Sequence, residues 1–291
     1  MSADTELAAG LGLPMRTHEL VLLHGQPGSA ADWQQVAERL PAGLYAITPD
    51  RPGYGSNPLP AAGFAAGARA VLDELDARSI QRAVLVGHSY GGGVALAVAS
   101  HAQHRVEAVV LLASVGPGCL GYVDKLLAAP AAGPLCALIA WQLTPWIGRA
   151  KLAAITRRRG HPPAPDDHVN FQIWAQASRE HGRLWRTFLA EQRALLHELD
   201  DLTSALPLVR APVLLLADPA DAVVPIETAY RLVQALPNAR LQLVARAGHR
   251  PSATASQPAS LPPGPPAITG TWARYRQPSL MAWISCLPLP P

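Results

Sequence analysis

Residues 83–101 read AVLVGHSYGGGVALAVASH, and this stretch decides the fold. The apolar run 83–86 is typical of a buried strand, and the small residues of 91–101 are typical of a closely packed helix. Between them, GHSYG at 87–91 forms a G-x-S-x-G pattern at a turn from strand to helix. A glycine-rich turn with an incidental serine would contain the same letters. In this context, however, Ser89 is the candidate nucleophile, because so tight a turn lifts its hydroxyl clear of the sheet.

The same alternation of short apolar runs and helical spacing continues on both sides of this stretch. It predicts strands over 19–23, 44–48, 106–112, 212–217 and 240–244, and helices over 30–40, 65–77 and 226–236. Alternating buried strands and helices are typical of parallel sheets. We therefore predict an α/β fold with a doubly wound, mostly parallel sheet covered by helices on both faces.

The alternation stops in the middle of the chain, where residues 116–206 have only helical or irregular patterns. We interpret this block as a helical cap inserted between two strands, over the edge of the sheet where ligands bind. The core would then comprise residues 1–115 and 207–249. The remainder, 250–291, holds ten prolines and lacks periodicity, which predicts an irregular Pro-rich C-terminal tail.

A serine hydroxyl becomes a nucleophile when a base takes its proton, and an imidazole suits this role near pH 7. Of the ten histidines, His249 follows the last predicted strand, at the edge where Ser89 emerges. His88 adjoins the serine, and we expect it to pack locally. Asp218 and Asp221 both follow the preceding strand, and either could orient the imidazole. Either could instead cap the next helix.

Acyl transfer also requires N–H donors for the negative charge that develops on the substrate oxygen. The sequence HGQPG at 24–28 places a turn directly after the first predicted strand. We propose the backbone N–H groups of Gln26 and Tyr90 as the oxyanion pair.

Composition excludes several classes of function. The 291 residues are 49% hydrophobic and 15% charged, which supports a large core. The net charge is only +3 and the single basic run is 157–159, so we expect no nucleic-acid partner. Three cysteines without paired spacing indicate neither a disulfide framework nor a zinc site, and we expect no metal and no cofactor.

The chain also contains one long uncharged segment, between Lys125 and Arg149. Its three prolines favour buried or interfacial helices over a stable membrane span. The first residues carry Asp4 and Glu6 where a secretory signal would be positively charged. We therefore expect a cytoplasmic protein. Nothing in the sequence indicates an oligomeric state.

Taken together, the motifs resemble those of the α/β-hydrolase superfamily, in that family's order of serine, aspartate and histidine. The resemblance covers roughly residues 19–249 and rests on HGQPG at 24–28, DRPGYGSN at 50–57, GHSYGG at 87–92, DxxVP at 221–225 and AGH at 247–249.

The resemblance implies a catalytic triad of Ser89, Asp221 and His249, in which Asp221 is chosen over Asp218 by its place before Val224-Pro225. It also implies an oxyanion hole at Gln26 and Tyr90, a cap over 116–206 and a structural role for the Asp50-Arg51 turn. The implied activity is cleavage of an ester or related small acyl substrate through an acyl-enzyme. The apolar, tryptophan-containing sequence of the predicted cap suggests that this substrate is hydrophobic. Neither a cofactor nor a metal is implied.

Two classes of alternative remain open. The same triad supports acyl transfer, perhydrolysis and hydrolysis of carbon–carbon bonds. The chain also departs from the family, because residues 1–17 are poorly patterned for the usual N-terminal hairpin and no amphipathic helix pattern follows His249. We hypothesise that a reading-frame change or a divergent terminus produced the tail. A catalytically impaired relative that acts as a binding protein is therefore the second alternative.

Overall fold

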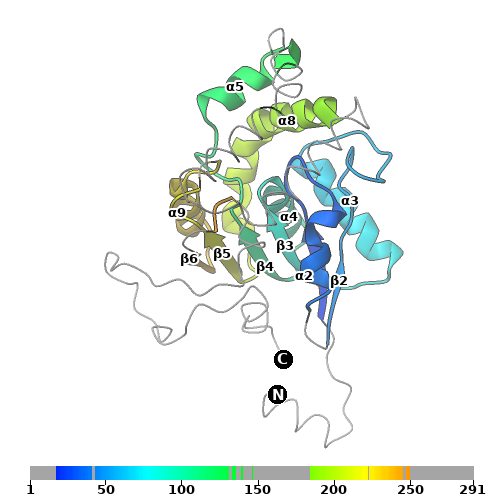
Figure 1. The fold of residues 1–291 in the computed structure, drawn as a ribbon. Coiled ribbons are helices and arrows are strands. Elements are labelled where there is room, and N and C mark those ends of the chain that lie inside the picture. The colour runs from blue at the N-terminus through cyan, green and yellow to red at the C-terminus, as the bar shows by residue number, and fades with distance from the viewer. Residues whose placement is uncertain are drawn as a thin grey trace, which may run out of the picture.

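The computed structural model describes residues 18–40, 43–130, 133–135, 139, 146, 184–221, 223–244 and 247–249. Its described strands form one sheet of order β2-β1-β3-β4-β5-β6, in which every neighbouring pair is parallel. These strands are β1 (His18–Leu23), β2 (Leu44–Ile47), β3 (Ala83–His88), β4 (Val106–Leu112), β5 (Val213–Ala217) and β6 (Ala239–Leu243) (Figure 1). The predicted doubly wound α/β fold is confirmed.

Helices connect the strands and cover the sheet. They are η1 (Ala30–Trp33), α2 (Gln34–Ala37), α3 (Phe64–Ala77), α4 (Tyr90–His101), η2 (Gln103–Arg105), α5 (Tyr122–Ala128), α8 (Leu184–Ala205), η3 (Leu206–Leu208) and α9 (Ile226–Ala235). The single helix predicted over 30–40 is instead a 3₁₀ turn followed by one α-helical turn. Pro41 disfavours helical dihedrals at Leu40, the residue before it, which argues against a helix running through residue 40.

The strand order reverses between β1 and β3, and this reversal places the site. From β1 the chain runs outward to β2 and then crosses back past β1 to β3. In open parallel sheets, the carboxyl ends of the strands at such a reversal form the crevice in which ligands bind. The loop 24–28 follows β1 and the turn 87–91 follows β3, so both glycine-rich motifs lie at this crevice.

The two faces of the sheet bury alternate residues of each strand, as the two-residue period of a strand requires. Val21 and Leu23 of β1 belong to the hydrophobic cluster shared with α3 and α4. Leu20 and Leu22 belong to the opposite cluster, which contains Trp33. The core therefore consists of two layers, one on each side of the sheet.

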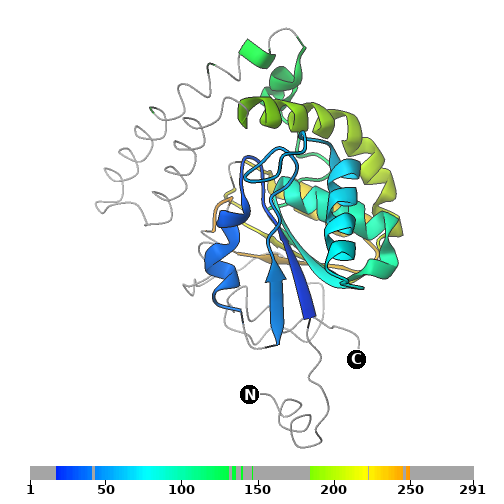
Figure 2. The ribbon, with the colours of Figure 1, turned by 90° about the vertical axis from the view of Figure 1, so that its right-hand side faces the viewer.

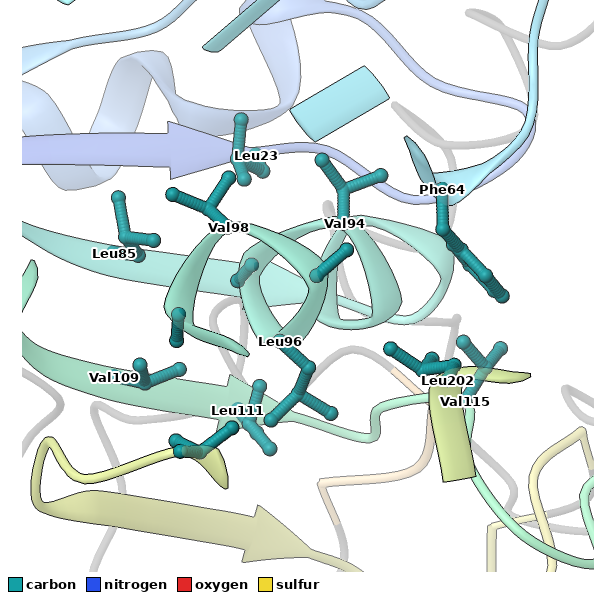
Figure 3. Packing of buried hydrophobic residues seen from close by; sticks show 14 of the residues in the cluster. Leu23, Phe64, Leu85, Val94, Leu96, Val98, Val109, Leu111, Val115 and Leu202 are labelled. Atoms are coloured by element: carbon teal, nitrogen blue, oxygen red, sulfur yellow. The ribbon is translucent and has the colours of Figure 1, made fainter. Parts of the chain in front are cut away.

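The central helix α4 is buried all round, since every residue from 90 to 100 is buried. Figure 3 shows Val94 and Val98 pointing toward the β1 side of the cluster, while Leu96 points toward Leu111 of β4. A helix that is apolar on every face fits only the interior of a domain. This packing fixes the N-terminus of α4, which carries the serine turn.

Helix α8 lies at the C-terminal end of the region predicted as the cap, residues 116–206, and joins it to the core. Figure 2 shows it beginning beyond the carboxyl ends of the strands and descending beside α3 and α4. Its residues Leu195, Leu199 and Leu202 belong to the core cluster, and Glu198 accepts the Ala65 N–H at 3.2 Å. The second half of α8 thus packs as part of the core.

Several predictions concern residues outside the described ranges. They are the Pro-rich tail at 250–291, the N-terminal departure at 1–17, the basic run 157–159 and most of the cap, whose boundaries stay a prediction. Among the helices that are described, none is both long enough and apolar enough to cross a bilayer.

Candidate active site

The turn between β3 and α4 raises Ser89 from the edge of the sheet. Ser89 has φ 51° and ψ −119°, a strained conformation that the surrounding structure must hold in place. Its N–H donates to the carbonyl oxygen of Leu112 at 2.9 Å. Only glycine fits two residues before and two residues after it: a Cβ on Gly87 would lie 2.5 Å from Gly91 O, and one on Gly91 would lie 2.4 Å from Leu23 O. The predicted strand–turn–helix context of the serine is present.

Side chains from three loops meet at this turn. His249, beyond β6, has its Nε2 3.1 Å from the Ser89 Oγ. The Nδ1 of the same ring lies 2.9 Å from Oδ2 of Asp221, in the loop after β5. Ser89 is buried, and the Asp221 side chain is 3% exposed. The sequence-predicted Ser89, His249 and Asp221 therefore form one chain of hydrogen-bonding groups.

The partners of the imidazole fix which nitrogen carries its proton. A carboxylate only accepts hydrogen bonds, so the Nδ1–H of His249 donates to Asp221. In the neutral ring, Nε2 then has a lone pair that faces the Ser89 hydroxyl, and Ser89 donates to it. This is the tautomer in which an imidazole can take a proton from serine.

The negative charge of Asp221 is stabilised by the groups that hydrogen-bond to its carboxylate. Burial alone would raise the pKa of Asp221, but the hydrogen bond and charge of His249, together with the N–H groups of Val223 and Val224, outweigh burial and lower it. A carboxyl with a lowered pKa in the folded state stabilises the fold above its ordinary pKa of about 4. That contribution is lost as the pH falls through the lower folded-state value.

Asp218, the other candidate acid, does not contact the imidazole in any hydrogen bond found in the structure. Its Oδ1 accepts the N–H of Ala220 at 2.9 Å, and its Oδ2 accepts the N–H of Gly248 at 2.7 Å. Asp218 is buried. It therefore joins the loop after β5 to the residue that precedes His249, while Asp221 is the acid that contacts the ring.

His88 contacts the backbone of His249 as well. Its Nε2 lies 2.7 Å from the carbonyl oxygen of His249, and because a carbonyl only accepts, Nε2 carries the proton and donates it. The two rings are 5.0 Å apart between centroids. The expectation that His88 packs only locally is wrong, because its partner lies 161 residues away. The backbone around His249 is thus held from both β3 and β5.

We expect His88→Leu to slow reaction at Ser89 about tenfold, since one hydrogen bond that positions His249 is worth up to about 1.4 kcal/mol. His88→Gln retains an N–H donor and should recover most of this loss. The rate constant of fluorophosphonate labelling measures the effect. Equal rates for natural, Leu and Gln proteins would contradict this role of His88.

The proposed oxyanion residues occupy adjacent segments. Tyr90 is the first residue of α4, so its backbone N–H has no acceptor within the helix. Gln26 follows Gly25, which lies against the serine turn: a Cβ on Gly25 would be 3.0 Å from Ser89 Cβ and 2.8 Å from His88 Nδ1. The loop that carries Gln26 therefore approaches the nucleophile closely.

Among the described residues, a small cavity lies close to the site. It lies beside Asp221 and is lined mainly by apolar side chains of β4, β5 and α9. Ser89 is not among its lining residues, so this space does not serve the reacting carbonyl. Across the part of the chain that is described, no three His, Cys, Asp or Glu side chains gather as metal ligands.

Glu191 is a buried residue that the sequence analysis missed. It pairs with Arg51 across the domain, and both side chains are almost fully buried. A signal was available, because Glu191, Leu195, Leu199 and Leu202 follow helical spacing on the buried face of α8. An acid within an apolar stripe indicates a buried charge that needs a partner.

Comparison with known proteins identifies the family of this chain. The sequence model of the alpha/beta hydrolase family matches residues 20–261. The pimeloyl-[acyl-carrier protein] methyl ester esterase of Aromatoleum aromaticum is 32% identical over 255 residues, which cover 81% of this chain and 93% of the esterase. The 2-hydroxy-6-oxo-6-phenylhexa-2,4-dienoate hydrolase of Burkholderia cepacia is 28% identical over 246 residues, which cover 79% of this chain and 80% of that hydrolase.

A solved structure has a similar fold. The thermophilic esterase from Thermogutta terrifontis superposes with a TM-score of 0.61 at 21% identity, covering 80% of this chain and 82% of the esterase chain. The family match spans most of the chain, and the relatives named here are hydrolases. This chain belongs to the alpha/beta hydrolase family.

Proposed function

We propose that this protein is a serine hydrolase that cleaves an ester or a related small, hydrophobic acyl substrate through an acyl-enzyme. The observation that carries the proposal is the continuous path from Ser89 Oγ to His249 at 3.1 Å and from His249 to Asp221 at 2.9 Å. Hydrogen-bond reach between nucleophile, base and orienting acid is the geometric requirement of this chemistry.

In the first half of the reaction, the Ser89 oxygen attacks the carbonyl carbon of the substrate while His249 Nε2 takes the hydroxyl proton. The carbonyl π electrons move to the oxygen, and the N–H groups of Gln26 and Tyr90 donate to that oxyanion. When the tetrahedral intermediate collapses, the carbon–oxygen bond to the leaving alcohol breaks. His249 then gives its proton to the alcohol.

In the second half, water attacks the acyl-enzyme and His249 accepts its proton. Collapse releases the acid and returns the proton to the Ser89 oxygen. Asp221 keeps its charge throughout and stabilises the imidazolium that forms in each half. The reaction balances without an oxidant, a metal or a cofactor. The cap predicted over 116–206 would cover the acyl group and account for a hydrophobic preference.

Hydrolysis of a carbon–carbon bond is a second candidate on the same residues. It is favoured by the likeness to the hydrolase from Burkholderia cepacia, whose name describes a phenylhexadienoate substrate. The esterase from Aromatoleum aromaticum, whose length is matched more fully, favours ester cleavage. A direct comparison of the two substrate classes on the purified protein decides between them.

We expect the purified full-length protein to release nitrophenol from p-nitrophenyl esters, with the rate depending on the length of the acyl chain. Rapid mixing should give an initial burst approaching one nitrophenol per protein wherever deacylation is the slower step. A 2-hydroxy-6-oxodienoate should be cleaved at a lower kcat/KM than the best ester. The reverse order would favour the carbon–carbon hydrolase. A folded protein that cleaves neither substrate would favour a binding protein.

A further inference from the structure

One buried cation contacts the loop that carries the first proposed oxyanion donor. The Nε of Arg51 donates to the carbonyl oxygen of His24, and its Nη2 donates to that of Gly25, both at 2.9 Å. The backbone N–H of Arg51 also donates to His24 Nε2 at 3.0 Å. Arg51 is 4% exposed. A single guanidinium thus contacts the two successive carbonyls before Gln26, and His24 Nδ1 lies 2.8 Å from the Gly25 carbonyl oxygen as well.

Holding the Gly25 carbonyl fixes the direction of the Gln26 N–H, because these two groups belong to the same peptide unit. A peptide unit is planar and, in its trans form, its C=O and N–H point in opposite directions. A hydrogen bond to the carbonyl also polarises the N–H on the other side and strengthens it as a donor. The positive charge of Arg51 makes this bond one of the stronger kind.

The same guanidinium reaches the second donor segment. Its central carbon lies 4.8 Å from the centroid of the Tyr90 ring, within the range of a cation–π contact. Tyr90 is the first residue of α4, and its N–H is the other proposed oxyanion donor. Arg51 therefore contacts both segments from which the two N–H groups come.

Glu191 of α8 holds Arg51 in this position. Its carboxylate pairs with the guanidinium, and the two side chains are 3% and 1% exposed. Tyr54 donates its hydroxyl to Glu191 Oε2 at 2.6 Å, and burial, helped by the charge of Glu191, raises the pKa of Tyr54 so that it keeps this proton. Burial alone would lower the pKa of Arg51, but the Glu191 carboxylate outweighs it and the guanidinium stays charged.

We propose that Arg51 is a positioning residue that orients and strengthens the Gln26 N–H as an oxyanion donor and packs against the ring of Tyr90, the residue of the second donor, and that Glu191 anchors Arg51 from α8. The inference rests on the proposed function, since it concerns the same reacting oxygen. Arg51 acts through the peptide unit of Gln26 and the ring of Tyr90. It should therefore affect the transition state, in which the oxyanion forms, more than the binding of the substrate.

Arg51→Lys tests this proposal, because lysine keeps the charge and loses the planar fork that bridges two carbonyls. The chain provides a matched control in Arg105→Lys. Arg105 donates to the carbonyls of Gln81 and Ile80, each at 2.8 Å, and pairs with Asp76, but it lies before β4 at the opposite edge of the sheet. The two variants lose the same type of contact at different places.

For Arg51→Lys we expect kcat on a p-nitrophenyl ester to fall about 10- to 100-fold, with KM changed less than about threefold. The rate constant of fluorophosphonate labelling should fall in parallel. Arg105→Lys should keep the natural rates. The melting temperature, measured on all three proteins, checks that the folded state is being compared.

The proposal would be overturned if a folded Arg51→Lys protein had the same kcat and labelling rate constant as the natural protein. It would also be overturned if Arg105→Lys lowered both as much as Arg51→Lys does. Should Arg51→Lys fail to fold, Glu191→Gln decides in its place, because glutamine keeps the shape of the side chain but lacks the anchoring charge and one acceptor oxygen. Slower labelling with KM retained would support the proposal, and an unchanged rate would overturn it. Failure of the natural folded protein to label would instead refute the proposed function.

Discussion

Ser89→Ala is expected to lower ester turnover by roughly 10⁶-fold, because removing the nucleophile of a triad removes the covalent route altogether. The backbone of the turn should be unaffected, since Gly87 and Gly91 supply the space it needs. Thermal stability should therefore stay close to that of the natural protein. Initial rates on a p-nitrophenyl ester, with the melting temperature as a check, measure this effect.

Ser100→Ala is the matched control for this prediction. Ser100 is another buried serine of α4, and its Oγ donates to the carbonyl oxygen of Ala97 at 3.0 Å, far along the helix from Ser89. Ser100→Ala should leave the rate of ester turnover unchanged. Residual turnover in Ser89→Ala within tenfold of the natural rate would mean that the reaction does not pass through this hydroxyl.

Asp221→Asn is expected to lower kcat roughly 10⁴-fold, because an amide can donate to His249 Nδ1 and thereby stabilise the wrong tautomer. The ring would then present Nε2–H to Ser89 and could not take its proton. Asp218→Asn should cost only about tenfold, the equivalent of one hydrogen bond to the Gly248 N–H. Steady-state kinetics on the same ester measure both losses.

The pair of variants distinguishes the two acids that follow β5. A larger loss in Asp218→Asn than in Asp221→Asn would mean that Asp218 is the orienting acid in the working enzyme. Equal and small losses would mean that His249 acts without a carboxylate partner. Melting curves for both variants separate these outcomes from simple destabilisation, since both side chains also hold the loop after β5.

The features that could be predicted from sequence are those with a local cause. The strand and helix on either side of Ser89 were predictable because an apolar run and a small-residue helix meet at two glycines. The alternation of elements sufficed to predict a parallel sheet, whereas the order of its strands was not predicted and comes from the structure. Ser89 and His249 could be paired because parallel strands end at one edge, which places their following loops together.

The features that could not be predicted depend on contacts between distant parts of the chain. His88 contacts His249 across 161 residues, and Arg51 contacts Glu191 across 140. Nothing local distinguishes His88 from a residue that merely fills the turn. For Asp218 and Asp221, the spacing alone fits either acid. The family resemblance selects Asp221, and in the structure the direction of each side chain separates the two. Glu191 alone had a local signal, as a charge within the apolar face of a helix.

The most direct test of the central claim, an activated serine at position 89, is to locate a fluorophosphonate adduct by mass spectrometry. Trypsin should release residues 83–105 as one peptide, which contains both Ser89 and Ser100. We expect a single adduct on this peptide, assigned to Ser89 by its fragment ions, absent from Ser89→Ala and much slower to form in His249→Ala. A folded natural protein that forms no adduct, or carries it on another residue, would contradict the claim.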